Sequence, residues 1–260
     1  MKNQSYILVI PTYNCENQIA SVLSSLLKSN ISEYFSLVLL IDNCSTDGTV
    51  LEATKFLREK TPDWLKIAKN KKNYGLGGTH KVAVKYCLEK NFNGFGIIHG
   101  DDQANIQELI DNLDLINNTR NVSAFLGARF MPNSKLVGYS VTRKLGNIIF
   151  NLVMTVITKK RIYDMGSGLN FFKTKDLIEL DVFRLPDDLT FNNKLILAFC
   201  ADRKEFVYFP ITWTESGQVS NAKLINQGIR ILGMSFRYLF TNNVSKHQSL
   251  NEYSYEILND

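Results

Sequence analysis

The first 130 residues alternate short apolar runs with longer segments of helical period. The apolar runs are residues 6–10, 37–41, 65–68, 96–99 and 123–127. The segments between them are long enough to form crossover helices. This β-α-β-α order predicts an α/β fold with a mostly parallel sheet and helices on both of its faces.

Composition narrows the class of protein. A chain of 260 residues with 45% apolar and 21% charged residues can bury a sizeable core. The longest apolar stretch, residues 148–157, is about half as long as a membrane-spanning helix. The N-terminus lacks a signal-peptide cleavage site, so we expect a cytoplasmic protein without a transmembrane helix.

Charge and cysteine spacing argue against a nucleic-acid-binding protein, a zinc protein and a disulfide-rich protein. The net charge of +5 is modest, the basic residues are dispersed, and no nucleic-acid-binding motif accompanies them. We therefore expect no nucleic-acid partner. The four cysteines contain no C-x-x-C pair, which favours reduced packing residues over a zinc site or a disulfide framework.

Polar clusters follow the first, second and fourth apolar runs. They are residues 11–14, 42–49 and 99–103. Because the carboxyl ends of parallel strands meet at one edge of a sheet, we expect these clusters to lie together there, where α/β proteins bind ligands.

The second cluster and a later glycine turn each have two interpretations. Asp42 could accept hydrogen bonds from a nucleotide base or ribose, whereas Asp42 or Asp47 could instead cap the next helix, and both can hold at once. Residues 73–78, Asn-Tyr-Gly-Leu-Gly-Gly, precede a helical segment. Such a turn lets backbone N–H groups approach an anion, but it can also be a simple turn.

Residues 99–103, His-Gly-Asp-Asp-Gln, end an apolar strand with two carboxylates, an imidazole and an amide. Adjacent carboxylates are costly to bury, so they are either solvated or bound to a cation. Mg²⁺ is commonly held by one or two carboxylates, with water and substrate phosphate completing its shell. The cluster is therefore either a metal site or an exposed acidic turn.

Taken together, these motifs resemble family-two glycosyltransferases. Residues 11–16 resemble the opening P-T-Y-N-E block, residues 42–49 the D-[DN]-x-S-x-D-G-T block, and residues 73–77 the third block. Residues 99–103 fall where the family has its metal-binding D-x-D motif, with His99 at the first acidic position.

Later residues resemble the branch that contains dolichyl-phosphate mannose synthase and other polyprenyl-phosphate glycosyltransferases. Residues 127–130 resemble its G-[ST]-R-[FY] motif, and residues 164–173 resemble a second motif, with Asn170 where the branch has Arg or Lys. Residues 209–220 with Lys223 resemble its V-P-I segment and G-x-S-K loop.

The resemblance implies a GT-A fold with a Rossmann-like sheet, which we expect to span residues 1–240, followed by a polar, frayed tail at 241–260. It implies inverting transfer of a sugar from a UDP- or GDP-sugar to a lipid-linked phosphate or a growing cell-surface glycan. A divalent metal, Mg²⁺ or Mn²⁺, would be bound by Asp101, Gln103 and His99. The residues expected to bind the nucleotide sugar are Pro11, Tyr13, Asn14, Glu16, Asp42, Asn73, Gly75, Gly77, Asp101, Arg129 and Lys223.

Two carboxylates are candidates for catalysis. A hydroxyl acceptor needs a general base, whereas an ionised lipid phosphate needs none. Asp164 is the first candidate, as the base or as a residue that positions the acceptor, and Asp188 is the second. Asp188 has a structural alternative, because residues 186–190 also have the pattern of a helix start.

Residues 143–161 and 223–239 place Lys and Arg beside apolar faces, as interfacial helices do, although helices packed on their own core look similar. We therefore expect peripheral binding to the inner face of the plasma membrane.

The alternative to an enzyme is a degenerate nucleotide-sugar-binding module without turnover, which His99 and Asn170 suggest.

Overall fold

The structure is a computed structural model that describes residues 5–215 and 252–259. Its strands are β1 (Tyr6–Thr12), β2 (Leu37–Asp42), β3 (Leu65–Asn70), β4 (Gly94–Ile98), β5 (Val122–Ala128), β6 (Lys135–Val137), β7 (Leu169–Lys173), β8 (Glu205–Pro210), β9 (Thr212–Thr214) and β10 (Tyr255–Ile257). Its helices are α1 (Ile19–Lys28), α2 (Thr49–Lys60), α3 (Gly75–Glu89), α4 (Ile106–Ile110), α5 (Leu113–Asn118), α6 (Val141–Thr158), α7 (Thr174–Glu179) and α8 (Phe191–Ala201), with 3-10 turns η1 (Ile31–Glu33) and η2 (Val182–Arg184).

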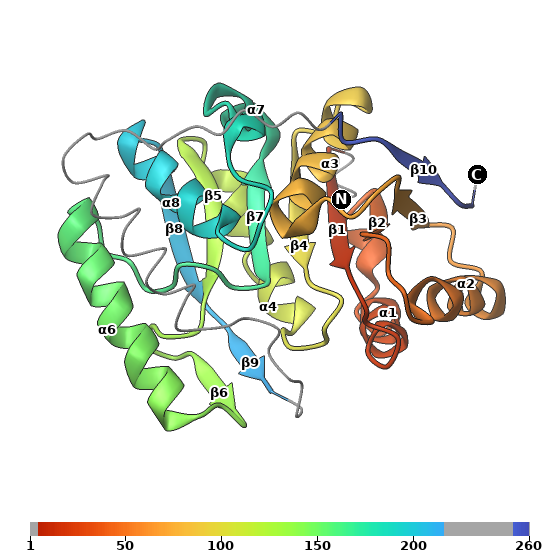
Figure 1. Cartoon of the computed structure of the whole chain (residues 1–260), viewed down its shortest axis with the longest axis horizontal. Helices are drawn as coiled ribbons and strands as arrows, with labels where there is room; N and C mark the ends of the chain where they lie inside the picture. Colours follow the sequence, from red (N-terminus) through yellow and green to blue (C-terminus); the bar gives the residue numbers. More distant parts are fainter. Residues whose placement is uncertain (1–4, 216–251, 260) are drawn as a thin grey trace.

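One eight-stranded sheet runs through the molecule in the order β10-β3-β2-β1-β4-β7-β5-β8 (Figure 1). Strands β1 to β4 pair in parallel, and β5 pairs in parallel with β8. Strands β7 and β10 run antiparallel to their neighbours, and β6 and β9 form a small separate sheet. The predicted mostly parallel sheet is confirmed.

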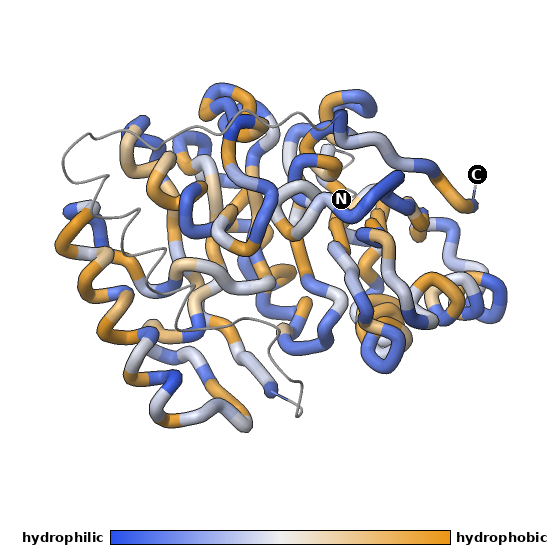
Figure 2. Tube along the Cα trace, in the orientation of Figure 1, coloured by the Kyte–Doolittle hydropathy of each residue, from blue (hydrophilic) through white to orange (hydrophobic). Residues whose placement is uncertain are grey.

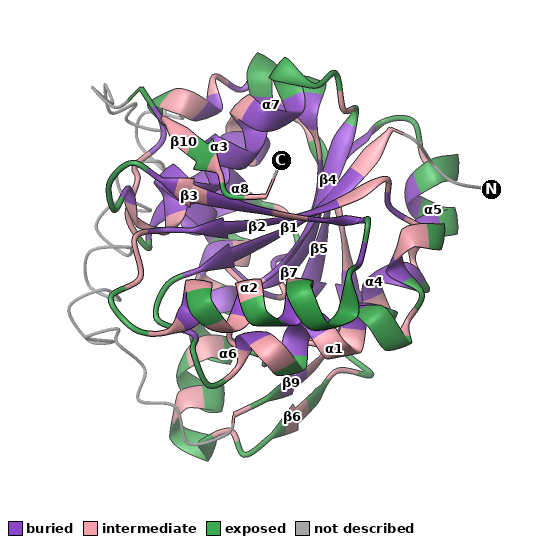
Figure 3. Ribbon diagram, turned by 90° about the vertical axis from the view of Figure 1, so that its right-hand side faces the viewer, coloured by how far each residue is buried: buried purple, intermediate pink, exposed green. Residues whose placement is uncertain are grey.

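Apolar side chains fill both faces of the sheet because successive residues of a strand point to opposite sides. In β1, Ile7 and Val9 belong to a core with α3, α6, α7 and α8. Leu8 and Ile10 belong to a second core with α1, α2, α4 and α5. Figure 3 shows the buried strands between the helices, as predicted for this fold.

The C-terminal residues differ from our prediction of a frayed tail. Residues 255–257 form β10, which pairs with β3 at one end of the sheet. Tyr253 is only 4% exposed and packs against the α3 core. The burial of this aromatic ring anchors a segment whose composition is otherwise polar. The segment 223–239 that was predicted to contact a membrane, the boundary at residue 240 and Lys223 lie outside the described residues.

None of the helices within residues 5–215 and 252–259 is long and apolar enough to cross a membrane. Cys15, Cys44, Cys87 and Cys200 are all free thiols, as predicted.

Candidate active site

The loops that follow β1 and β2 bind each other. Asn14 adopts a left-handed backbone conformation, with φ of 54°. Its backbone N–H donates to Ser45 Oγ (2.9 Å), and its side-chain Oδ1 accepts from the Thr46 N–H (2.9 Å). Glu16 Oε2 accepts from the Gly48 N–H (3.1 Å). Asn14 and Glu16, which were predicted to bind the donor, therefore hold the two loops as one unit.

The two aspartates of the second loop have different partners. Asp47 Oδ1 accepts hydrogen bonds from the backbone N–H (3.0 Å) and hydroxyl (2.5 Å) of Thr49, the first residue of α2, although the N-cap residue of that helix is Gly48. Asp42 lies at the end of β2, is completely buried, and accepts from the Ser45 N–H (3.2 Å). Beside it at the end of β1, Pro11 is buried and Tyr13 is 44% exposed.

Asn43 joins the second loop to the glycine turn, a role that the sequence alone did not reveal. Its Oδ1 accepts from the Tyr74 N–H (2.8 Å), and its Nδ2 donates to Asn73 Oδ1 (2.8 Å). Asn73 Oδ1 also accepts from the Gly75 N–H (2.9 Å). The side-chain amide of Asn43, the residue after Asp42, thus fixes the position of the turn that we expect to approach the donor.

The glycines of this turn are required by close packing against residues 186–188. Gly75 has φ of +75°, and a Cβ there would lie 2.5 Å from the Asp187 carbonyl oxygen. A Cβ on Gly77 would lie 2.4 Å from the Pro186 carbonyl oxygen, and the Gly78 N–H donates to the Asp187 carbonyl (3.1 Å). The turn therefore has a packing function besides any contact with a donor.

Gly77→Ala is expected to destabilise the protein by about 1–3 kcal/mol, because the added methyl group overlaps a backbone oxygen that cannot move freely. The measurement is the free energy of unfolding in urea. Gly146→Ala is the matched control, since Gly146 also lies in a helix but its Cβ would meet nothing within 4 Å. That control should be neutral or stabilise by up to about 1 kcal/mol, because alanine favours helix. If both variants lost the same free energy of unfolding, the packing explanation would be contradicted.

The predicted metal-binding residues follow β4. Burial, with a further contribution from Asp102, raises the pKa of Asp101 to about 6. Gln103 donates its backbone N–H to Asp101 Oδ1 (3.4 Å) and accepts from the Thr214 N–H through its carbonyl (2.9 Å). Burial, followed by the nearby Arg129, lowers the pKa of His99 to about 4, so its imidazole is neutral.

The residue types after β4 suit a metal ion whose coordination shell is completed by water and substrate phosphate. In the part of the chain that the structure describes, no three His, Cys, Asp or Glu side chains are grouped to hold an ion by themselves. A divalent cation of the Mg²⁺ type, however, needs only one or two protein carboxylates beside water and phosphate. The half-buried Asp101 carboxylate, the Gln103 amide and the neutral His99 imidazole are side chains after β4 that have donor atoms for such a cation.

Arg129, at the end of β5, forms a buried bidentate ion pair with Asp164. Its Nε donates to Asp164 Oδ2 (2.8 Å) and its Nη2 to Asp164 Oδ1 (2.9 Å). Burial opposes the charged form of Arg129, but Asp164 outweighs this effect and raises its pKa above the usual value. The backbone N–H groups of Arg129 and Gly166 also donate to Asp164. Asp164, our first candidate base, is 2% exposed and holds Arg129 in place.

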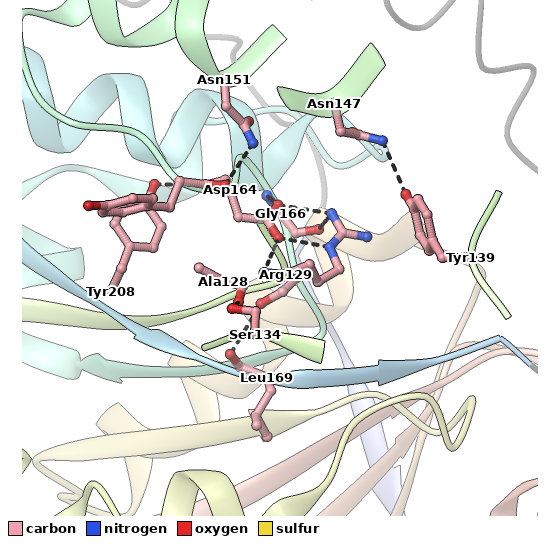
Figure 4. A network of polar contacts seen from close by, with 12 residues as sticks. Ala128, Arg129, Ser134, Tyr139, Asn147, Asn151, Asp164, Gly166, Leu169 and Tyr208 are labelled. Atoms are coloured by element: carbon pink, nitrogen blue, oxygen red, sulfur yellow. Dashed lines mark hydrogen bonds and ion pairs between the residues drawn. The ribbon is translucent and has the colours of Figure 1, made fainter. Parts of the chain in front are cut away.

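Further contacts fix this pair (Figure 4). The Tyr208 hydroxyl donates to the Asp164 carbonyl (2.7 Å), and Asn151 of α6 donates to the carbonyl of the adjacent Tyr163 (2.7 Å). The Arg129 guanidinium stacks over the Trp213 ring, 5.1 Å from its centroid. The charge of Arg129 partly opposes the rise in the pKa of Asp101 that burial causes, so the two groups lie in one electrostatic environment.

A sequence model of glycosyl transferase family 2 matches residues 7–180, more than half of the chain. The chain belongs to glycosyl transferase family 2. It is therefore a glycosyltransferase, as the motifs predicted.

Named relatives of this glycosyltransferase include an undecaprenyl-phosphate mannosyltransferase of Micrococcus luteus. The two are 24% identical over 216 residues, which cover 80% of this chain and 83% of the relative. The Staphylococcus aureus poly(ribitol-phosphate) beta-N-acetylglucosaminyltransferase TarS is 32% identical over 107 residues, covering 41% of this chain. That match spans only 18% of TarS, which is a much longer protein.

Solved structures confirm the GT-A fold of the glycosyltransferase. Glucosyl-3-phosphoglycerate synthase from Mycobacterium tuberculosis, in complex with UDP, superposes with a TM-score of 0.64 at 12% identity, over 92% of this chain and 80% of that one. S. aureus TarS 1–349 in complex with UDP-GlcNAc gives 0.61 at 21% identity, over 95% of this chain and 68% of that one.

Two further residues singled out in the sequence, the second candidate base Asp188 and the motif residue Asn170, have structural partners in this glycosyltransferase. Asp188 Oδ1 accepts from the backbone N–H (2.9 Å) and hydroxyl (2.5 Å) of Thr190, just before α8, as its structural alternative predicted. Asn170 is 4% exposed in β7 and donates to the Ser167 carbonyl (2.8 Å). It lines a cavity of about 10 Å³ behind Asp164, which has room for about one water. That cavity cannot hold a sugar nucleotide, so the open edge of the sheet remains the candidate site.

Proposed function

We propose that this glycosyltransferase moves a sugar from a nucleotide diphosphate sugar to a lipid-linked phosphate, with inversion at the anomeric carbon. The observation that carries this proposal is the Arg129 cation, which Asp164 fixes at the carboxyl end of β5 and whose charge acts on Asp101, just after β4. The name of the M. luteus relative, an undecaprenyl-phosphate mannosyltransferase, supports a lipid phosphate as acceptor.

The donor would lie along the loops after β1, β2 and β3. Tyr13 supplies an exposed ring, Asp42 a carboxylate at the end of β2, and residues 73–77 a turn at the N-terminus of α3. Asn14, Glu16 and Asn43 contribute by fixing these loops relative to one another. Complexes of the structural neighbours with UDP and UDP-GlcNAc support a uridine nucleotide.

A divalent metal, Mg²⁺ or Mn²⁺, would be held by Asp101, with Gln103 through a water and His99 as further ligands. When bound, it supplies positive charge for the departing nucleoside diphosphate. A complex of the M. tuberculosis synthase with Mn²⁺ and UDP supports this requirement.

The reaction needs little acid–base chemistry from the protein. An oxygen of the ionised acceptor phosphate attacks the anomeric carbon, and the bond from that carbon to the diphosphate oxygen breaks, with its electron pair leaving on the diphosphate. No proton is removed from such an acceptor, so no general base is required. Arg129, held by Asp164, would stabilise the negative charge through preorganised electrostatics. This gives Asp164 the positioning role and gives Asp188 no part in the reaction, since its carboxylate binds Thr190 just before α8.

The first experiment is a thermal-stability screen of the purified protein against UDP- and GDP-sugars, with and without Mn²⁺. A donor at 100 times its dissociation constant should stabilise the fold by roughly 2.7 kcal/mol. The donor that raises the melting temperature is then incubated with undecaprenyl phosphate, and transfer of labelled sugar to the lipid is measured.

Three outcomes are informative. A metal-dependent shift followed by transfer supports the proposal. A shift without transfer to undecaprenyl phosphate contradicts the lipid-phosphate acceptor and favours a binding module that lacks turnover. No shift with any donor overturns the assignment of the site.

The lipid acceptor suggests peripheral binding at the inner membrane surface, for which α6 is the candidate surface. Its outer face exposes the apolar residues Val141, Leu145, Ile148, Ile149, Leu152 and Val156. Residues 141–161 contain no Asp or Glu but include Arg143, Lys144, Lys159, Lys160 and Arg161. Figure 2 shows these apolar segments along α6 at the periphery of the molecule. An apolar face flanked by basic residues suits an anionic lipid surface.

Ile149→Glu is expected to weaken binding to vesicles that contain anionic phospholipid by about tenfold or more. The change removes an exposed apolar side chain that would enter the lipid surface, and it adds a negative charge that anionic lipid repels. Co-sedimentation with vesicles measures this. Leu51→Glu is the control, because Leu51 is 69% exposed on α2, at the opposite end of the molecule (Figure 1). If both variants sediment like the unmodified protein, α6 is not the membrane-binding surface.

A further inference from the structure

Residues 252–259, here called the C-terminal strap, run from α3 to the edge of the sheet beside β3 (Figure 1). Tyr253 and Ser254 lie against the glycine turn that the proposed function assigns to the donor. Tyr253 has φ of 48°, in the left-handed region, and its ring packs 5.5 Å from that of Tyr74. This backbone conformation costs free energy in a bulky residue, so the contacts made by Tyr253 must compensate for it.

Tyr253 completes a buried polar cluster with Lys81 and Asp187. Lys81 is fully buried, and its Nζ donates to Asp187 Oδ1 (2.6 Å), to the Tyr253 hydroxyl (3.0 Å) and to the Leu185 carbonyl. The Tyr253 hydroxyl donates in turn to Asp187 Oδ1 (2.8 Å). A buried ammonium group requires such acceptors, so removing one of them disturbs the whole cluster.

Asp187 links this cluster to the turn. Its carbonyl accepts from the Gly78 N–H (3.1 Å) and lies so close to Gly75 that a Cβ there would be 2.5 Å away. The side-chain contacts of Asp187 with Tyr253 and Lys81 therefore determine where its backbone rests on the turn.

Ser254 contacts the same turn through Tyr74. The Tyr74 hydroxyl donates to the Ser254 carbonyl (3.2 Å) and accepts from the Ser254 N–H (3.0 Å). The backbone N–H of Tyr74 donates to Asn43, the neighbour of Asp42. The strap is thus connected to the turn through Asp187 and, independently, through Tyr74.

We propose that the C-terminal strap positions the donor-binding turn, with Tyr253 as a positioning residue that acts through Asp187 and Tyr74 without touching the donor. This inference rests on the proposed function, because it requires residues 73–77 to bind the nucleotide sugar. It predicts that the strap and the donor site are energetically coupled, and such coupling is reciprocal.

The unmodified protein provides the first test. Hydrogen exchange of backbone amides is measured with and without the nucleotide sugar that gives the largest thermal shift. Donor binding should slow exchange at Ser254 and Gly78, although neither amide needs to contact the donor. Unchanged exchange at Ser254 under saturating donor would overturn the inference.

The second test compares Tyr253→Phe with Tyr255→Phe. Both remove one hydroxyl from the strap, but the Tyr255 hydroxyl donates to Glu89 at the end of α3, away from the turn. Tyr253→Phe should raise the dissociation constant for the nucleotide sugar by about tenfold at a temperature where the protein is folded. Tyr255→Phe should leave it unchanged, even if its melting temperature falls as far.

Failures of the two proposals can be told apart. If the unmodified protein binds no donor, the proposed function fails and this inference fails with it. If the unmodified protein binds a donor and Tyr253→Phe binds it equally well, only the strap's role is overturned. If Tyr253→Phe does not fold, the exchange measurement on the unmodified protein decides.

Discussion

Asp101→Asn is expected to lower the rate of sugar transfer by about 1,000-fold. Burial raises the pKa of this carboxyl to about 6 even though the charge of Arg129 acts in the opposite direction, so its charged form needs further positive charge. The amide variant keeps the shape of the side chain but cannot neutralise a divalent metal, so the departing diphosphate would lose its main charge compensation. The measurements are the transfer rate at saturating donor and, separately, the affinity for Mn²⁺.

Asp102→Asn is the matched control. Asp102 is the adjacent carboxylate, it is exposed, and its φ of 58° is one that asparagine tolerates well. Transfer should change little in this variant. The assignment of Asp101 would be wrong if the two variants lost activity equally, or if Asp101→Asn bound Mn²⁺ as tightly as the unmodified protein.

Asp164→Asn should destabilise the fold by about 3–5 kcal/mol, because it leaves the Arg129 guanidinium buried without its counter-charge. The Asp164 side chain is 2% exposed and that of Arg129 15%, so water cannot replace the lost partner. Urea unfolding followed by circular dichroism measures this change. The same variant should also lose transfer activity, since Arg129 would no longer be held in place.

The double variant Asp164→Leu, Arg129→Met tests whether the loss of stability comes from an unpaired charge or from lost packing contacts. If it comes from an unpaired charge, the double variant should lose less free energy of unfolding than the sum of the losses in the two single variants. Glu256→Gln, which breaks the exposed ion pair with Lys71, should alter stability only slightly. Additive losses in the double variant would contradict the ion-pair explanation.

The sequence predicted the parallel half of the fold well because its signals are local. The apolar run predicted at 37–41 is β2, Leu37–Asp42, and the polar cluster after it begins at the strand end. A helix after the glycine residues was also predicted, because helical period is visible in a short window. It begins earlier than predicted, since α3 starts at Gly75 and the glycines expected to form a preceding turn belong to its first turn.

The contacts that complete the site depend on residues far apart in the chain. Arg129 and Asp164 are separated by 35 positions, and each matched a motif without revealing the other as its partner. Lys81 carries a charged side chain within the helical segment, so by its own polarity it resembles a solvent-exposed helix position. Its burial depends on Tyr253, which lies 172 positions later in a segment predicted to be frayed. Residue-by-residue polarity cannot reveal such a partner.

The place of β10 in the sheet also affects whether the edge of β3 is open to pairing with a second molecule. Without β10, β3 would present a six-residue row of backbone donors and acceptors that could pair with another molecule. The three-residue β10 covers the part of that row formed by residues 68–70. Its own outer edge is too short to serve as an extended template, and it carries the charged residue Glu256. A chain lacking residues 252–259 should therefore be more prone to aggregation at high concentration, whatever happens to its activity.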